Sequence, residues 1–189
     1  FCLDMATSTI TRGKVEVASR RHEDLQPGWA IDAEGRPTID PAAAFEGALL
    51  PLGGVEETGG HKGYGLTLLV DILTGVLGGS TAAPLIIPLF STRDGEADLG
   101  QVFMAIDPDA IDQAGAFESR LEHEFELLTS SRTAPDAPDR ILIPGEPETE
   151  AERRSDERGV VMDVEHHENL VEVGFRAGIS FPVTTPIGG

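Results

Sequence analysis

The sequence predicts an α+β fold, with a mostly antiparallel sheet flanked by helices. Three observations favour this class. Some segments place apolar residues three and four positions apart, which is the spacing of an amphipathic helix. Others are short apolar runs bounded by glycine and proline, which is typical of strands. The two kinds of segment do not alternate regularly, so the sequence does not favour a doubly wound parallel sheet.

Short strands are expected where brief apolar runs lie between turn-forming residues. These runs cover residues 1–8, 29–32, 101–106, 141–143 and 160–162. The rest of the stretch 26–41 is expected to be loop, because Pro27-Gly28 and Gly35-Arg36-Pro37 form turns.

Helices are expected over residues 10–22, 64–77, 108–128, 148–158 and 165–177. The second segment is apolar nearly all round, so we expect it to be buried. The third has Asp107 as an N-cap and Pro108 in its first turn. Its apolar stripe consists of Ile111, Ala114, Phe117, Leu121, Phe125 and Leu128. The fourth is highly charged and is expected to be solvated, and Gly178 ends the last.

The charge balance is the most unusual bulk property. The chain has 33 acidic and 14 basic residues, a net charge of -19, and its only lysines are Lys14 and Lys62. Such a surface repels phosphate backbones and anionic lipid, so neither nucleic acid nor a membrane is expected as a partner. A disordered acidic chain is one interpretation, but 40% hydrophobic residues with clear periodicity favour the other. We expect a haloarchaeal-type acidic surface and a cytoplasmic protein bathed in concentrated KCl.

Several site types find no support in the residues. No G-x-G-x-x-G follows a strand, and the glycines before Lys62 do not have the spacing of a phosphate-binding loop. The five histidines form no metal set, since His166 and His167 point in different directions from a helix. Cys2 is alone, so no disulfide framework or multi-thiolate zinc site is possible. The first residue is not methionine, and we expect the chain to be a fragment or a processed product.

Two short elements near the N-terminal side are candidates for ligand binding. Asp4, Thr7 and Ser8 offer a carboxylate and two hydroxyls for a sugar or an amide, although turns and caps use the same residues. The glycine-rich turn at 60–65 contains Lys62 and opens a helix. Its free N–H groups and the lysine charge suit an anion. The alternative is a helix-entry turn with a solvated lysine.

A third element is the turn Pro144-Gly145-Glu146, which follows an expected strand. A carboxylate at such a turn accepts hydrogen bonds from both hydroxyls of a ribose. In a chain with 33 acidic residues, an exposed acid without a function is the alternative.

Seven motifs occur in one order along about residues 1–180. They are Phe1-Cys2-Leu3-Asp4-Met5-Ala6-Thr7-Ser8, Pro27-Gly28-Trp29-Ala30-Ile31-Asp32, the stretch 35–41, Leu50-Pro51-Leu52-Gly53-Gly54, His61-Lys62-Gly63-Tyr64-Gly65-Leu66, Phe103-Met104-Ala105-Ile106-Asp107-Pro108 and Ile143-Pro144-Gly145-Glu146. Each motif is unspecific alone, but the ordered set resembles the family of malate, L-lactate, ureidoglycolate and sulfolactate dehydrogenases that lacks a Rossmann fold.

The resemblance implies a homodimer that binds NAD, with NADP as the alternative, in a domain without a Rossmann fold. In that family an Asp-Met-Ala-Thr strand, a Lys-Gly-Tyr-Gly turn and a Pro-Gly-Glu turn contact the cofactor. The matching residues here are Asp4, Met5, Ala6, Thr7, Lys62, Pro144, Gly145 and Glu146. The family's catalytic histidine lies in an N-terminal half that this sequence lacks, so we assign neither a catalytic residue nor a metal ligand.

On this basis the chain is expected to divide into a cofactor-binding portion at 1–146, a C-terminal helical segment at 147–181 and a tail at 182–189. The expected function is interconversion of a malate- or lactate-like 2-hydroxy acid and its 2-oxo acid by the complete enzyme, with an inactive fragment here. The nearest alternative is a family member that reduces cyclic imino acids with NADPH. An alternative of another class is a non-catalytic dimerisation or binding module.

Overall fold

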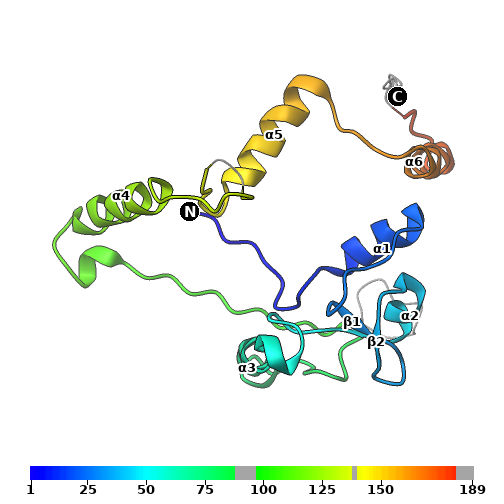
Figure 1. The fold of residues 1–189 in the computed structure, drawn as a ribbon, viewed down its shortest axis with the longest axis horizontal. Helices are drawn as coiled ribbons and strands as arrows, with labels where there is room; N and C mark the ends of the chain where they lie inside the picture. The colour runs from blue at the N-terminus through cyan, green and yellow to red at the C-terminus, as the bar shows by residue number, and fades with distance from the viewer. Residues whose placement is uncertain (88–96, 138–139, 182–189) are drawn as a thin grey trace. The chain divides into compact units, whose positions relative to one another are not determined.

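The computed structural model describes residues 1–87, 97–137 and 140–181, and its chain divides into two units (Figure 1). Met5–Phe117 form the N-terminal unit, and Phe1–Asp4 together with Glu118–Gly189 form the C-terminal unit. The expected tail at 182–189 lies outside the described residues. The functional division at residues 146 and 181 stays a prediction.

A small antiparallel sheet lies in the N-terminal unit. Its strand order is β2-β1-β3, with β1 (Ala30–Ile31) between β2 (Pro37–Thr38) and β3 (Ala48–Leu49). Ala30 pairs with Thr38 on one side and with Leu49 on the other, and both pairings are antiparallel. An antiparallel sheet accompanied by helices confirms the α+β class, and the strand expected near residues 29–32 is β1.

The core of this unit forms where two helices meet the sheet. Helix α1 (Arg12–Arg21) packs against α2 (Pro41–Glu46), which begins at Asp40, whose carboxylate accepts a hydrogen bond from the Ala42 N–H. The buried apolar residues are Ile10, Val15, Leu25, Ala30 and Ala44, and Ala18, Trp29, Phe45 and Leu49 pack around them. Burial of this apolar surface is the main force that stabilises the unit. The helix expected over 10–22 is confirmed as α1.

The β1–β2 hairpin is closed by one side chain. The Asp32 carboxylate accepts hydrogen bonds from the backbone N–H of Arg36 at 2.8 Å and of Glu34 at 3.0 Å, and Arg36 Nε lies 2.9 Å from Asp32 Oδ2. The hydrogen bond from the Arg36 backbone, followed by its side chain, lowers the pKa of Asp32 below its ordinary value. The turn-forming residues predicted after β1 therefore form the loop that connects β1 to β2.

The glycine turn opens a long helical segment, as predicted. A short 3₁₀ turn, η1 (Glu56–Thr58), precedes α3 (Gly60–Asp71), which continues as the π-helical turn η2 (Ile72–Val76). The prediction that this helix is buried is wrong within the described part of the chain, where Tyr64, Leu69 and Val76 are exposed. The reason is that its fully buried residues are the glycines Gly60, Gly63 and Gly75, so mainly its backbone packs against the rest of the unit, and Leu73 is only half-buried.

Three helices follow in the second part of the chain. They are α4 (Ala116–Thr129), α5 (Glu146–Arg158) and α6 (Val164–Arg176), which confirm the expected helices there. The predicted start of α4 is wrong. Asp107 caps only the 3₁₀ turn η3 (Pro108–Ala110), because Gly115 has a φ of 74° and a left-handed residue interrupts a right-handed helix.

The strands expected at 1–8, 101–106, 141–143 and 160–162 are not found among the described residues. These segments are extended or irregular, and the first makes only the isolated antiparallel bridge between Ser8 and Pro51. A strand requires a neighbour that accepts and donates its backbone hydrogen bonds over several residues. Among the described residues, the first segment has only a few such bonds, to residues 50–52 and to Pro144, and the described chain supplies no such ladder beside the other three. None of the helices described here has the length and apolar content needed to cross a membrane.

Candidate functional site

The glycine turn before α3 depends on close backbone contacts. A Cβ atom at Gly60 would lie 1.9 Å from the carbonyl oxygen of Gly54, and one at Gly63 would lie 2.0 Å from that of Leu52. Gly59 has a φ of 97°, which favours glycine because other residues have a Cβ that clashes there. The glycines therefore bring the α3 N-terminus against the 52–54 turn.

Lys62 lies in the first turn of α3 and its side chain folds back over Gly59. A Cβ atom at Gly59 would lie 3.7 Å from Lys62 Nζ. Gly59 provides no side-chain cap, and the Lys62 side chain is exposed. A lysine charge beside the positive end of a helix dipole is an arrangement that attracts anions.

Two hydrogen bonds between its first and last residues close the turn at 143–146. The Glu146 N–H donates to the Ile143 carbonyl at 3.0 Å, and the Ile143 N–H donates to Glu146 Oε2 at 2.6 Å. Gly145 has a φ of 103° and stands immediately before α5. Thr149 Oγ1 donates to the Gly145 carbonyl at 2.9 Å, which fixes the turn to the helix. Glu146 is thus held as the first residue of α5.

The N-terminal residues of the chain lie against this turn. The Cys2 N–H donates to the Pro144 carbonyl at 2.9 Å, and a Cβ atom at Gly145 would lie 3.0 Å from the Cys2 Cβ. The Phe1 and Phe125 rings stack with their centroids 6.4 Å apart. Segments that lie far apart in the sequence therefore meet at Pro144–Glu146.

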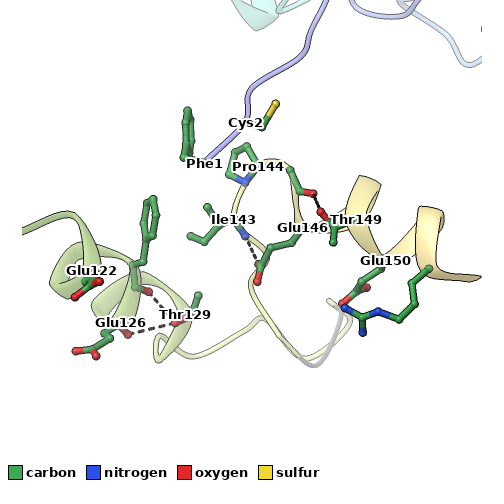
Figure 2. A pocket seen from close by; sticks show the side chains of 13 residues that line it. Phe1, Cys2, Glu122, Glu126, Thr129, Ile143, Pro144, Glu146, Thr149 and Glu150 are labelled. Carbon is green, nitrogen blue, oxygen red and sulfur yellow. Dashed lines mark hydrogen bonds between the residues drawn. The ribbon is translucent and has the colours of Figure 1, made fainter. Parts of the chain in front are cut away.

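These contacts border an open pocket of about 700 Å³ in the C-terminal unit (Figure 2). Apolar rings and four carboxylates line it, and Arg153 is the one cationic side chain among its described lining residues. The lining residues are Phe1, Cys2, Glu122, Phe125, Glu126, Thr129, Ile143, Pro144, Gly145, Glu146, Thr149, Glu150 and Arg153. Arg140 pairs with Glu150 at its edge. Pockets of this volume bind small organic ligands.

The eight residues expected at the cofactor are divided between the two units. Asp4 and the 144–146 turn belong to the C-terminal unit, whereas Met5–Thr7 and Lys62 belong to the N-terminal unit. The Thr7 carbonyl accepts from the Leu52 N–H at 2.9 Å, so the first element lies beside the turn that supports α3. A single site formed by all eight residues stays a prediction.

Sequence reasoning missed Phe125 as a pocket residue. Phe125 belongs to the apolar stripe of α4, which indicates only a packed helix face. No local pattern marks it as a pocket residue, because the pocket arises from tertiary contacts. In the part of the chain that the structure describes, no three His, Cys, Asp or Glu side chains lie close enough to hold a metal ion.

Comparison with known proteins supplies the family. A family profile described as malate/L-lactate dehydrogenase matches residues 1–171. The chain is 43% identical to a malate dehydrogenase of Pyrococcus horikoshii over 148 residues, which are 77% of this chain and 40% of that protein. It is 35% identical to a Delta(1)-pyrroline-2-carboxylate reductase of Ancylobacter novellus over 176 residues, 93% of this chain and 48% of that protein.

Solved structures agree with the sequence relatives. A malate dehydrogenase from Entamoeba histolytica superposes with a TM-score of 0.84 at 27% identity. The superposition covers 97% of this chain and 52% of the Entamoeba protein. A sulfolactate dehydrogenase from Methanocaldococcus jannaschii gives 0.71 at 32% identity, with 94% and 48% covered. The chain spans about half the length of the curated relatives it matches. With a profile match over residues 1–171, the chain belongs to the malate/L-lactate dehydrogenase family of oxidoreductases.

Proposed function

We propose that this chain is the cofactor-binding part of an enzyme that interconverts a malate- or lactate-like 2-hydroxy acid and its 2-oxo acid with NAD. The observation that carries the proposal is the pocket of about 700 Å³ around Pro144–Glu146, in a chain of this family. Its volume, its aromatic rings and the carboxylate at the turn fit the adenosine part of a dinucleotide. NADP is the alternative cofactor.

Each proposed residue has a role that follows from its position. Lys62, at the α3 N-terminus, would bind an anionic part of the cofactor, as helix N-termini and lysines do together. Glu146 would accept hydrogen bonds from ribose hydroxyls at the pocket. Asp4, Met5, Ala6 and Thr7 would contact the cofactor as an extended segment, and Pro144 and Gly145 would shape the turn. NAD supplies the hydride acceptor when bound, and we assign the general base to the half beyond this chain.

The acidic composition supports the rest of the proposal. The net charge of -19 on this chain, with only two lysines, supports an enzyme that works in the cytoplasm at high KCl. The homodimer is proposed from the resemblance to the family and not from the charge. Nucleic acid and lipid surfaces are not proposed as partners, because both are polyanionic.

A cyclic imino-acid reductase is the second candidate. The match to the Ancylobacter novellus pyrroline-carboxylate reductase covers 93% of this chain, whereas the match to the Pyrococcus horikoshii malate dehydrogenase covers 77%. Both reactions move a hydride between a cofactor and a carbon next to a carboxylate, so the same cofactor-binding site can serve either reaction.

The test is a comparison of substrates with the complete enzyme, meaning this chain together with the half that its relatives have in addition. Turnover of malate or lactate with NAD is expected, and turnover of pyrroline-2-carboxylate alone would favour the second candidate. The 189-residue chain by itself is the matched control and should be inactive. Activity of the chain alone would place the general base within it, and a complete enzyme without any of these activities would favour a binding module.

A further inference from the structure

One face of α5 borders the pocket in the C-terminal unit. Four side chains of that face line it: Glu146, Thr149, Glu150 and Arg153 (Figure 2). Each of them lies three or four residues from another member of the set, and residues at this spacing are neighbours on a helix surface. The charged groups of this face therefore act together on whatever the pocket binds.

Glu150 is the member of this face that has a partner of opposite charge. Its Oε1 atom accepts a hydrogen bond from Arg140 Nη2, and the two side chains form an ion pair. Glu150 lines the pocket, whereas Arg140 stands outside the lining with 55% of its side chain exposed. The ion pair therefore holds the Arg140 guanidinium at the rim of the pocket.

Arg140 is also close to the turn that holds Glu146. It stands three residues before Ile143, and three residues of extended backbone span at most about 11 Å. The Ile143 N–H donates to Glu146 Oε2 at 2.6 Å, so the two ends of this short stretch are a guanidinium and the carboxylate proposed for the ribose. A long, flexible arginine side chain at this position can turn toward the ribose when no carboxylate engages it.

Carboxylates outnumber cations in the lining. Glu122, Glu126, Glu146 and Glu150 face one cation, Arg153, which has no ion-pair partner among the described residues. A free 2′-hydroxyl is neutral and donates to a carboxylate, whereas a 2′-phosphate is an anion that carboxylates repel. Arginine is the residue that accommodates such a phosphate, through paired N–H donors. With Arg140 held by Glu150, the pocket has too few available cations for a 2′-phosphate.

We propose that Glu150 determines the preference for NAD over NADP by holding Arg140 away from the place of a 2′-phosphate. This inference rests on the proposed cofactor site, and it deepens it by naming the ligand as an adenosine with a free 2′-hydroxyl. Glu150 is a positioning residue, because it acts through Arg140. Without its carboxylate, Arg140 and Arg153 are both available to a phosphate, and two guanidinium groups form a clamp for that anion.

A double-mutant cycle on the complete enzyme tests the inference. The Kd values of NADH and NADPH are measured by fluorescence at one fixed high KCl concentration for the parent, Glu150→Ala, Arg140→Gln and the double variant. Glu150→Ala should tighten NADPH binding at least about tenfold, because charge-assisted bonds to the phosphate form, and should change the NADH Kd by less than about twofold. Arg140→Gln alone should not tighten NADPH binding, and the double variant should lose most of the gain.

Glu148→Ala is the matched control, because it removes one carboxylate from an exposed position of α5 outside the lining. Both Kd values should stay within about twofold of the parent, since an exposed charge is screened at high KCl. Circular dichroism checks the fold of each variant. Glu150→Gln, which keeps the side-chain volume, replaces the alanine variant if that variant does not fold.

Three results would overturn the inference while NADH still binds the parent and the proposed function stands. The first is an unchanged NADPH Kd in Glu150→Ala. The second is an equal gain in the double variant, since loss of one negative charge would then explain the effect without Arg140. The third is an equal gain in Glu148→Ala. A parent enzyme that binds neither cofactor would overturn the inference and the proposed function together.

Discussion

The backbone N–H of Ile143 donates a hydrogen bond to Oε2 of Glu146 at 2.6 Å, and the Glu146 N–H returns one to the Ile143 carbonyl at 3.0 Å. The carboxylate proposed to bind the cofactor ribose therefore also closes its own turn, three residues from its donor. Truncating this side chain would disturb the turn and remove the charge together. A substitution that keeps the acceptor and removes only the charge separates the two effects.

We predict that Glu146→Gln in the complete enzyme lowers the preference for NAD over NADP at least about tenfold, measured as the ratio of kcat/KM values. The amide oxygen still accepts from Ile143, but the negative charge that repels a 2′-phosphate is gone, and about 1.4 kcal/mol corresponds to tenfold. Glu148→Gln, in the same helix but outside the pocket lining, is the control. Equal ratios in the two variants would show that Glu146 does not discriminate.

Lys62→Ala should weaken NADH binding to the complete enzyme by about 1.5–3 kcal/mol, the range for a hydrogen bond to a charged group. Quenching or enhancement of NADH fluorescence gives the Kd. Lys14→Ala removes the chain's other lysine, which lies in α1, and should leave the Kd unchanged. A Kd that is the same for both variants would make Lys62 a solvated surface charge.

The glycines of α3 provide a matched pair for stability. Gly63→Ala should lower the free energy of unfolding of the chain by about 1–3 kcal/mol, because its Cβ would overlap the Leu52 carbonyl oxygen and force a backbone shift. A Cβ at Gly65 has nothing within 4 Å, so Gly65→Ala should raise the stability by about 0.5–1 kcal/mol. Denaturant unfolding followed by circular dichroism measures both. Opposite signs are expected, and a stabilising Gly63→Ala would contradict the packed turn.

The acidic surface should require salt. The Tm of the complete enzyme should fall when KCl is reduced from about 1 M to about 0.1 M, where the screening length grows from about 3 Å to about 10 Å and the carboxylates repel one another. Sucrose in place of the removed KCl tests whether charge screening is responsible, because an uncharged solute does not screen. A Tm that does not change between the two salt concentrations would refute the halophilic interpretation.

The sequence alone determined the elements that depend on local interactions. Helices α1, α5 and α6 were predicted from residue patterns within each segment, such as the charged run of α5 and Gly178 after α6, since each helical hydrogen bond joins residues four apart. The glycine turn before α3 follows in the same way. The ordered motifs also identified the family, because they extend over about residues 1–180 and not over a single element.

Only the tertiary structure decided which expected strands form and what the candidate residues contact. The segment 101–106 has the composition of a strand, but a strand exists only with a neighbour, and the described chain provides none. The prediction that α3 is buried was wrong for a similar reason, because the burial of a helix depends on what packs against it. The pocket joins Cys2 and Phe125 with Glu146, residues far apart in sequence whose proximity is set by long-range packing that no local pattern encodes.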